Sequence, residues 1–405
     1  MNVSDSRYVV IVGTLDTKGP EIAFLRDCLH QLGCRTRVVD IGLLAPPAFA
    51  ADISREVVAA RMDTTVERLL AGSQERVAAM TLMARGVNGL LADWLEASEV
   101  AGVIAVGGGV GTWVGTTVMR ALPIGLPKIM VSTLPFDIRP QLGAKDIVVF
   151  PSVADILGLN PTLRTVLRNA AAALAGMAAL PRLPATSKKV IGMTGMGITT
   201  PAVLASRKFL EEGGVEVTSF HTNGRGGSVF EEWIQMGMFS GVLDLTTHEI
   251  TSRIFNGIAL AEETRLETAA KQGVPQVVGP GGLDVISRGP VETLDANDRR
   301  RPHYRHSPFF THVRISPEGM RAVAATVAQK MNLSRAPTVF AIPLQGFSEQ
   351  SRSGGAVCDP VADEAFVVTL KQRLRQDIRV VEIDAHINDE AFARRACALL
   401  QEIMD

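Results

Sequence analysis

The stretch VVIVGTLDTKGPEIAFLRDCL, residues Val9–Leu29, decides the fold class. Its apolar run begins at Tyr8 and predicts a buried strand as far as Val12, and apolar residues at helical spacing over residues 20–32 predict a helix. A second strand is predicted at residues 36–41. A strand, a helix and a strand in this order form a βαβ unit, so the two strands are expected to be parallel neighbours in one sheet.

Two domains are expected, because a chain of 405 residues exceeds the size at which one hydrophobic core usually keeps growing. The segment PRLPATSKK, residues 181–189, interrupts the pattern with prolines and basic residues, and a new strand, Gly/Thr-rich loop and helix follow it. We therefore predict an N-terminal domain at residues 1–183 and a C-terminal domain at residues 184–405. The predicted fold class is α/β, with two Rossmann-like, doubly wound domains, mostly parallel sheets and a cleft between the domains.

The charge balance argues against a general attraction to nucleic acid or to an anionic membrane. The 41 basic and 42 acidic residues leave a formal net charge of −1, so recognition is expected to depend on a local site. The four cysteines show no zinc-type spacing and predict reduced thiols. We find no run of the ~18 apolar residues that a membrane span needs and no signal peptide, so the cytoplasm is the expected compartment.

The polar loop of the opening stretch predicts a phosphate site. Asp16, Thr17 and Lys18 lie between the end of a strand and the start of a helix. Free backbone N–H groups and the helix dipole favour an anion at such a place, and a lysine adds positive charge. Asp16 is also a candidate for holding Mg²⁺ through water. Because Gly19 and Pro20 follow the lysine, this is not a Walker loop, and simple helix capping is the alternative explanation.

A second predicted ligand loop is rich in glycine. Gly108, Gly109, Val110, Gly111 and Thr112 follow the apolar strand GVIAV, and glycines at a strand end let the backbone approach a phosphate closely. The third glycine of the dinucleotide-binding fingerprint is absent, so a dehydrogenase is disfavoured. A tight contact between a helix and a strand is the alternative explanation.

The C-terminal half repeats this arrangement in two loops. Gly195 and Gly197 belong to the first loop, GMTGMGITT, and Asn223 and Arg225 belong to the second, HTNGRGG. An asparagine and an arginine beside a glycine bend suit recognition of an oxyanion or a phosphate. An exposed turn would equally explain Arg225.

Glu249 is the predicted catalytic residue. It follows the strand of LDLTTHEI together with His248, and both side chains are suited to acid–base chemistry. Adjacent residues of a strand point to opposite faces, so both can enter one site only from a loop. The segment HYRHSPFFTH is predicted to be an irregular loop over a cleft, and a zinc site there is disfavoured because prolines flank and interrupt it.

A resemblance to a known family rests on seven motifs in order: VGTLDTKG, VGGGVGT, GMTGMG, HTNGRGG, LDLTTHE, PQVVGPGGLD and HINDEAF. They resemble the family of ATP-binding domains named after the resistance protein against tomato mosaic virus, over almost the whole chain. The resemblance implies two α/β domains, a nucleotide bound by the strand-end loops, Mg²⁺ as its companion and a homodimer. The positions that match the family's nucleotide loops are Asp16, Thr17, Lys18, Gly108–Thr112, Gly195, Gly197, Asn223 and Arg225. PGGLD departs from the PGALD expected in the family, which affects only the local backbone.

The resemblance identifies the nucleotide as ATP, whereas the residues alone predict only a phosphate. The leading hypothesis is an ATP-binding protein in which Lys18 and Arg225 neutralise phosphate charge and Asp16 positions Mg²⁺. Hydrolysis of ATP, or phosphoryl or acyl transfer to a small molecule, would use Glu249, with the acceptor in the cleft near His221, Glu249 and His306. Two alternatives stay open: an ATP-stabilised regulatory module without turnover, and a nucleotide-independent hydrolase or lyase acting on a small organic acid.

Overall fold

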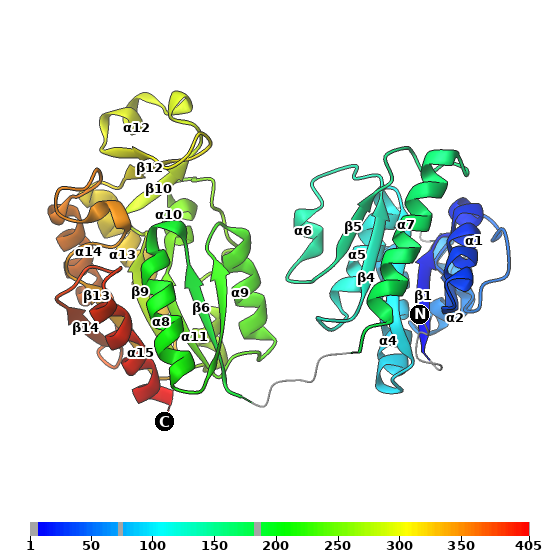
Figure 1. Ribbon diagram of the computed structural model, residues 1–405, viewed down its shortest axis with the longest axis horizontal. Coiled ribbons are helices and arrows are strands. Elements are labelled where there is room, and N and C mark those ends of the chain that lie inside the picture. Colours follow the sequence, from blue (N-terminus) through cyan, green and yellow to red (C-terminus); the bar gives the residue numbers. More distant parts are fainter. Residues whose placement is uncertain (1–6, 72–75, 182–187, 405) are drawn as a thin grey trace. The chain divides into compact units, whose positions relative to one another are not determined.

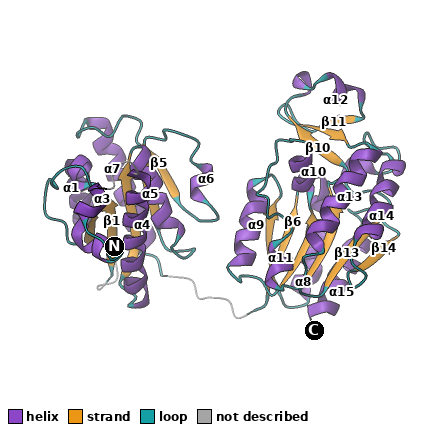
Figure 2. Cartoon of the chain, turned by 180° about the vertical axis from the view of Figure 1, so that it is seen from behind, coloured by secondary structure: helices purple, strands orange, loops and turns teal. Residues whose placement is uncertain are grey.

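The computed structural model describes residues 7–71, 76–181 and 188–404. The chain divides into two compact units, Met1–Ala185 and Thr186–Asp405, and each unit has its own parallel sheet between layers of helices (Figures 1 and 2). The predicted α/β class with mostly parallel sheets is therefore confirmed. The domain boundary predicted after residue 183 lies outside the described residues.

The N-terminal domain is built on a five-stranded parallel sheet with the strand order β2-β1-β3-β4-β5. Its strands are β1 (Tyr8–Gly13), β2 (Arg35–Asp40), β3 (Val100–Gly107), β4 (Lys128–Ser132) and β5 (Val148–Pro151). Its helices are α1 (Leu15–Gln31), α2 (Arg55–Ala60), α3 (Val66–Ala71), α4 (Arg76–Glu96), α5 (Gly109–Arg120), α6 (Arg139–Leu142) and α7 (Pro161–Ala178). The first strand thus lies inside the sheet, with later strands on both sides of it.

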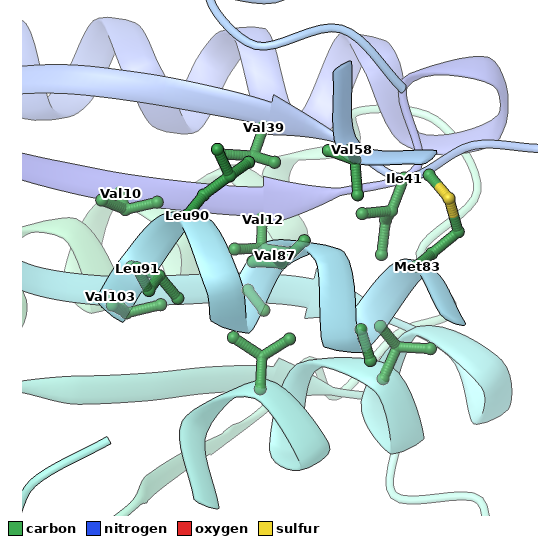
Figure 3. Packing of buried hydrophobic residues seen from close by; sticks show 14 of the residues in the cluster. Val10, Val12, Val39, Ile41, Val58, Met83, Val87, Leu90, Leu91 and Val103 are labelled. Atoms are coloured by element: carbon green, nitrogen blue, oxygen red, sulfur yellow. The ribbon is translucent and has the colours of Figure 1, made fainter. Parts of the chain in front are cut away.

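Alternate residues of β1 belong to two different cores, because successive side chains of a strand point to opposite faces. Val10 and Val12 pack in the cluster that contains Leu91 of α4 (Figure 3). Val9 and Ile11 pack on the other face, in the cluster formed with α1 and α7. Helices cover both faces of the sheet, which explains why β1 and β3 are apolar along their whole length.

α1 begins earlier than the sequence predicted. The helix was expected at residues 20–32, but it starts at Leu15 and contains a kink at Lys18 (φ −127°, ψ 17°). The predicted polar loop is therefore largely the first turn of α1. Pro20 follows the kink and so lies at the start of the regular segment, where its missing N–H is tolerated.

The segment of residues 52–84 contains several helical elements. It contains α2, α3 and the first part of α4, and residues 72–75 within it lie outside the described residues. In the described part of the chain, no helix is both long and apolar enough to cross a membrane.

The C-terminal domain is built on a six-stranded parallel sheet with the order β14-β13-β9-β8-β6-β7. Its strands are β6 (Val190–Gly195), β7 (Glu216–His221), β8 (Gly241–Thr246), β9 (Gln276–Gly281), β13 (Thr338–Pro343) and β14 (Arg379–Ile383). Its helices are α8 (Thr200–Glu212), α9 (Arg225–Gln235), α10 (His248–Ile254), α11 (Thr268–Gln272), α12 (Ala296–Arg300), α13 (Pro317–Met331), α14 (Pro360–Arg373) and α15 (Glu390–Met404). As in the other domain, the first strand, β6, lies between the second and the third.

A small antiparallel sheet follows β9, in the order β10-β12-β11. It consists of β10 (Val285–Arg288), β11 (His303–Arg305) and β12 (Thr311–Arg314). The prediction of an irregular loop for HYRHSPFFTH is therefore wrong, because β11 and β12 form a hairpin. Pro308 falls in the connection between them, where a missing N–H breaks no ladder hydrogen bond.

Leu91→Ala tests the core between the N-terminal sheet and α4. Leu91 is fully buried, and we expect the change to lower the free energy of unfolding of this domain by about 2–5 kcal/mol because it leaves a cavity. Val77→Ala on the same helix is the control: its side chain is 68% exposed, and it should change the free energy by less than about 0.5 kcal/mol. Urea unfolding measures both, and equal stability of the two variants would contradict this packing.

Candidate functional site

The two polar loops of the N-terminal domain meet at the carboxyl ends of β1 and β3. These strands are neighbours, but α1 packs on one face of the sheet and α5 on the other, and such a switch in direction opens a crevice. A cavity of about 390 Å³ lies there, lined on its polar side by Thr14, Asp16, Thr17, Lys18 and residues 107–111. Its volume falls within the range of about 300–1,000 Å³ typical of small-molecule sites.

The glycine loop contributes the N-terminus of α5 to this cavity. The amides of Gly109, Val110 and Gly111 lie in the first turn and have no hydrogen-bond acceptor within the described residues. A Cβ on Gly108 would meet nothing closer than 3.9 Å, and one on Gly109 nothing closer than 3.8 Å. The protein's own packing therefore does not require glycine at these two positions, and the space beside them is open to a ligand.

Gly107 and Thr112 have a different role from the glycines between them. A Cβ on Gly107 would lie 2.5 Å from Cα of Gly111, so here the tight contact between strand and helix explains the glycine. Thr112 is fully buried. Its hydroxyl donates to the carbonyl of Gly107 at 3.2 Å and forms a hydrogen bond of 2.7 Å with Ser132. Thr112 thus holds the loop in shape from behind.

Two carboxylates, Asp16 and Asp40, hold backbone amides near the cavity. Asp40 is buried, and its Oδ1 accepts from the amides of Leu15 at 3.0 Å and Gly42 at 2.8 Å. Burial raises the pKa of Asp40, and these two hydrogen bonds act in the opposite direction. Asp16 Oδ2 accepts from the amide of Leu44 at 2.7 Å. Asp16 Oδ1 is buried and has no partner within the described residues, so it is available to a cation.

Lys18 supplies the positive charge of the site. Its Nζ donates to the carbonyl of Ile156, and an ammonium group has three donors, so two remain for a ligand. The hydroxyls of Thr14 and Thr17 lie 2.7 Å apart and form a hydrogen bond. Both threonines line the cavity, and each can also accept or donate toward a bound molecule.

The remaining wall of the cavity is apolar. It consists of Leu43, Leu44, Leu69, Leu70, Ala79 and Met80. Sequence reasoning missed these residues, because a leucine that lines a cavity has the same local pattern as one in the core. The arrangement places the unpaired amides of the glycine loop and an apolar surface in one cavity, which suits a ligand with a charged end and an apolar end.

The loop HTNGRGG of the C-terminal domain is organised around Glu249. Its Oε1 accepts from the amides of Gly224 at 2.7 Å and Gly227 at 3.0 Å, and its Oε2 accepts from Nε of Arg265 at 2.7 Å. A Cβ on Gly227 would lie 1.9 Å from Oε2, so glycine is required there by the carboxylate. Glu249 thus occupies the anion position at the start of α9, and the predicted catalytic role of this residue stays a prediction.

Arg265 is the centre of a buried ionic network. Its guanidinium is paired with Asp244 (Nη2–Oδ1, 2.7 Å), Glu231 (Nη1–Oε1, 3.3 Å) and Glu249, and all four side chains are buried. Burial raises the pKa of Glu249, and Arg265 opposes this shift. Sequence reasoning missed Arg265, although an aspartate within the apolar strand β8 was a signal that a buried partner exists.

The other predicted ligand residues also belong to the C-terminal domain. Asn223 Oδ1 accepts from the amide of Gly226 at 3.2 Å, and Arg225 is exposed at the first position of α9. Gly195 ends β6, and Gly197 follows it beside the ring of His306. The structure therefore brings residues 16–18 and 108–111 to one cavity of the N-terminal domain. The other four predicted ligand residues belong to loops of the C-terminal sheet.

Three histidines gather near the antiparallel sheet. The ring of His312 lies 5.2 Å from that of His306 and 6.1 Å from that of His248, between ring centroids. Within the described residues, no group of three or more His, Cys, Asp or Glu side chains is arranged to hold a metal ion. Burial, together with the two neighbouring histidines, lowers the pKa of His312 from 6.5 to about 3.

Two family models match the chain. They are the N-terminal domain of the uncharacterised protein family UPF0261, over residues 7–182, and the C-terminal domain of the same family, over residues 188–404. The chain belongs to the UPF0261 family. A UPF0261 protein of Clostridium tetani (strain Massachusetts / E88) is 36% identical over 404 residues, which cover 99% of this chain and 100% of that protein. A UPF0261 protein of Rhizobium meliloti (strain 1021) is 39% identical over 401 residues, covering 98% and 99%.

A plant relative supports the resemblance seen in the motifs. The ToMV resistance protein Tm-1(GCR237) of Solanum lycopersicum is 30% identical over 416 residues, which cover 96% of this chain and 55% of that protein. The predicted relationship to the family of this resistance protein is confirmed as a similarity in sequence, and ATP binding stays a prediction.

Arg265→Met tests the ionic network of the C-terminal domain. We expect it to lower the free energy of unfolding by about 3–5 kcal/mol at pH 7.5, because three buried carboxylates lose their counter-charge. The deficit should shrink toward pH 5, since protonation neutralises the unpaired carboxylates. The control is Arg253→Met, whose ion pair with Glu263 is exposed and whose loss should cost less than about 1 kcal/mol. Urea unfolding at both pH values measures this, and a fully stable Arg265→Met protein at pH 7.5 would refute the network.

His312 makes the stability of the C-terminal domain depend on pH. Its pKa is lowered from 6.5 to about 3 in the folded protein, so below pH 6.5 the unfolded chain binds a proton that the folded chain does not. Stability therefore falls as the pH falls from 6.5 toward 3, by about 2 kcal/mol between pH 7 and pH 5 from this group. Urea unfolding of His312→Asn should lack this part of the dependence, whereas the exposed control His221→Asn should retain it. Identical slopes for the wild type and His312→Asn would contradict the assignment.

Proposed function

We propose that the N-terminal domain binds a nucleotide, ATP with Mg²⁺, in the cavity at the carboxyl ends of β1 and β3. The observation that supports this proposal is the composition of the cavity. One space of about 390 Å³ combines the glycine-rich start of a helix, a lysine and an apolar wall. An unpartnered carboxylate oxygen lies on one of the residues that line it.

The phosphates bind at the glycine loop in this proposal. The unpaired amides of Gly109, Val110 and Gly111 are donors, and the dipole of the twelve-residue helix α5 favours negative charge at its N-terminus. The absence of side chains at positions 108 and 109 lets phosphate oxygens approach the backbone closely. Lys18 adds a positive charge through the two donors that Ile156 leaves free.

Mg²⁺ is held by Asp16 in this proposal. The buried Oδ1 of Asp16 lacks a partner within the described residues, and Mg²⁺ is usually bound by one or two carboxylates together with substrate phosphates. One carboxylate beside the phosphate loop therefore fits this ion. When bound there, Mg²⁺ would offset part of the negative charge of the phosphates.

The base lies against the apolar wall. Leu43, Leu69 and Met80 are among the residues of this wall, and an aromatic base gains from contact with such a surface. These side chains have no donors or acceptors that distinguish one base from another. The choice of adenine rests on the resemblance of the sequence motifs to the family of ATP-binding domains.

Binding without turnover is a second candidate function, and the position of Glu249 favours it. Both oxygens of this carboxylate already accept hydrogen bonds from the loop and from Arg265, which suits a positioning role. Hydrolysis that uses Glu249 stays a prediction, as do ligand contacts from Gly195, Gly197, Asn223 and Arg225 and the homodimer.

Gly109→Ala tests the nucleotide site. We expect a ten- to hundredfold weaker affinity for MgATP, corresponding to about 1–3 kcal/mol of overpacking against the phosphate. Folding should not suffer, because the added methyl group meets no protein atom within 3.8 Å. Isothermal titration of the full chain with MgATP measures the affinity, and phosphate release in the same sample separates turnover from binding.

Gly176→Ala is the matched control for this experiment. Gly176 lies in α7, and a Cβ there would meet no atom within 4 Å. Both variants should be as stable as the wild type or slightly more stable, since alanine favours a helix over glycine. Equal affinities of the two variants would show that the glycine loop does not contact the nucleotide. No binding by the wild type at millimolar MgATP would overturn the proposed function.

A further inference from the structure

Buried polar atoms without a partner are concentrated around the small antiparallel sheet of the C-terminal domain. Eight buried side-chain atoms lack a hydrogen-bond partner within the described residues, and five of them lie on Asp284, Thr311, His312 and Arg314. Such atoms are rare in folded proteins, and each requires a physical explanation. Arg314 and Asp284 form an ion pair of 3.3 Å, whereas no ion pair accounts for Nε2 of His312.

A chain of hydrogen bonds connects Gly282 to His312, and the donor and the acceptor of each bond can be assigned. His248 Nδ1 lies 2.8 Å from the carbonyl oxygen of Gly282, which can only accept, so Nδ1 carries a proton. Burial lowers the pKa of His248, so its ring is neutral and its Nε2 accepts. That Nε2 lies 2.8 Å from Ser287 Oγ and takes the hydroxyl hydrogen. Ser287 Oγ can then accept from His312 Nδ1, at 3.1 Å.

His312 is consequently held with its proton on Nδ1 and a lone pair on Nε2. The residue is 3% exposed, and no donor reaches Nε2 within the described residues. A buried acceptor without a hydrogen bond costs free energy that a donor of suitable geometry would restore. The chain from Gly282 through His248 and Ser287 prevents the ring from adopting the other tautomer.

Two aromatic rings of the β11–β12 hairpin lie near the ring of His312, and one of them lies beside the loop that follows β6. The ring centroids of His306 and Tyr304 lie 5.2 Å and 6.5 Å from that of His312. A Cβ on Gly197, in the loop after β6, would meet only the ring of His306, at 3.6 Å. The His306 side chain is exposed and makes no hydrogen bond within the described residues, so it can rotate without breaking one.

We propose that Nε2 of His312 recognises a hydroxyl group of a small molecule bound between the loop of Gly197 and the β11–β12 hairpin. A hydroxyl is a neutral donor, whereas an ammonium group would lose its hydration beside three imidazoles, and an ionised acid has no hydrogen to donate. A site built around a buried acceptor rejects analogues that lack the matching hydroxyl. This site lies in the C-terminal domain and does not depend on the nucleotide cavity.

The first test is the protonation pattern of His312 in the full chain. Long-range ¹H–¹⁵N spectra of protein labelled with ¹⁵N-histidine should show, at pH 7, a proton on Nδ1 and none on Nε2, with the resonance assigned through His312→Asn. Ser287→Ala should abolish this fixed tautomer, and His306→Asn should retain it. A proton on Nε2 of His312 in the spectrum of the wild type would by itself overturn the proposal.

The second test uses isopropanol and acetone as probes. They share a carbon skeleton, but only the alcohol can donate a hydrogen bond to Nε2. Isopropanol should shift the Nε2 resonance of His312 saturably, with an affinity about five- to tenfold higher than that of acetone, as expected for one net hydrogen bond. Ser287→Ala should lose this preference and His306→Asn should keep it. Equal responses to the two probes, or no saturable response to isopropanol, would overturn the proposal.

Discussion

The rest of this structure depends on one constraint: in each domain, the first strand of the parallel sheet is an interior strand and not an edge strand. A parallel connection must cross a face of the sheet, and β1 and β6 each have later strands on both sides. The helices that follow adjacent strands therefore lie on opposite faces, and the loops at the carboxyl ends separate to leave a crevice. The polar segments that follow β1, β3, β6, β7 and β8 all lie at such strand ends.

The two domains use this edge of the sheet in different ways. In the N-terminal domain, the first amides of α5 have no acceptor within the described residues and border a cavity. In the C-terminal domain, Glu249 accepts from the amides at the start of α9 and is itself held by Arg265. An internal carboxylate thus takes the place that an anionic ligand could occupy. Several buried polar atoms of this domain instead lack a partner within the described residues, and Nε2 of His312 is one of them.

Much of the fold could be predicted because its signals are local. Apolar runs predicted strands in both sheets. Polar residues at one strand end and glycines at another predicted site positions at residues 16–18 and 108–111, which line one cavity. The start of α1 was missed because Asp16 and its neighbours are equally compatible with a loop and with a first helical turn. The β11–β12 hairpin was missed because strand pairing satisfies backbone groups that appear free in the sequence.

Partners distant in the chain could not be predicted at all. Arg265 and Glu249 are 16 residues apart, and His248 and Ser287 are 39 apart, and no local pattern connects them. The sequence by itself determined where strands end and hence where the polar loops lie, because periodicity and backbone freedom depend on neighbouring residues. Only the tertiary structure decided which loops share a cavity, which amides are satisfied internally and which nitrogen keeps its lone pair, because these depend on hydrogen bonds and packing between residues far apart in the chain.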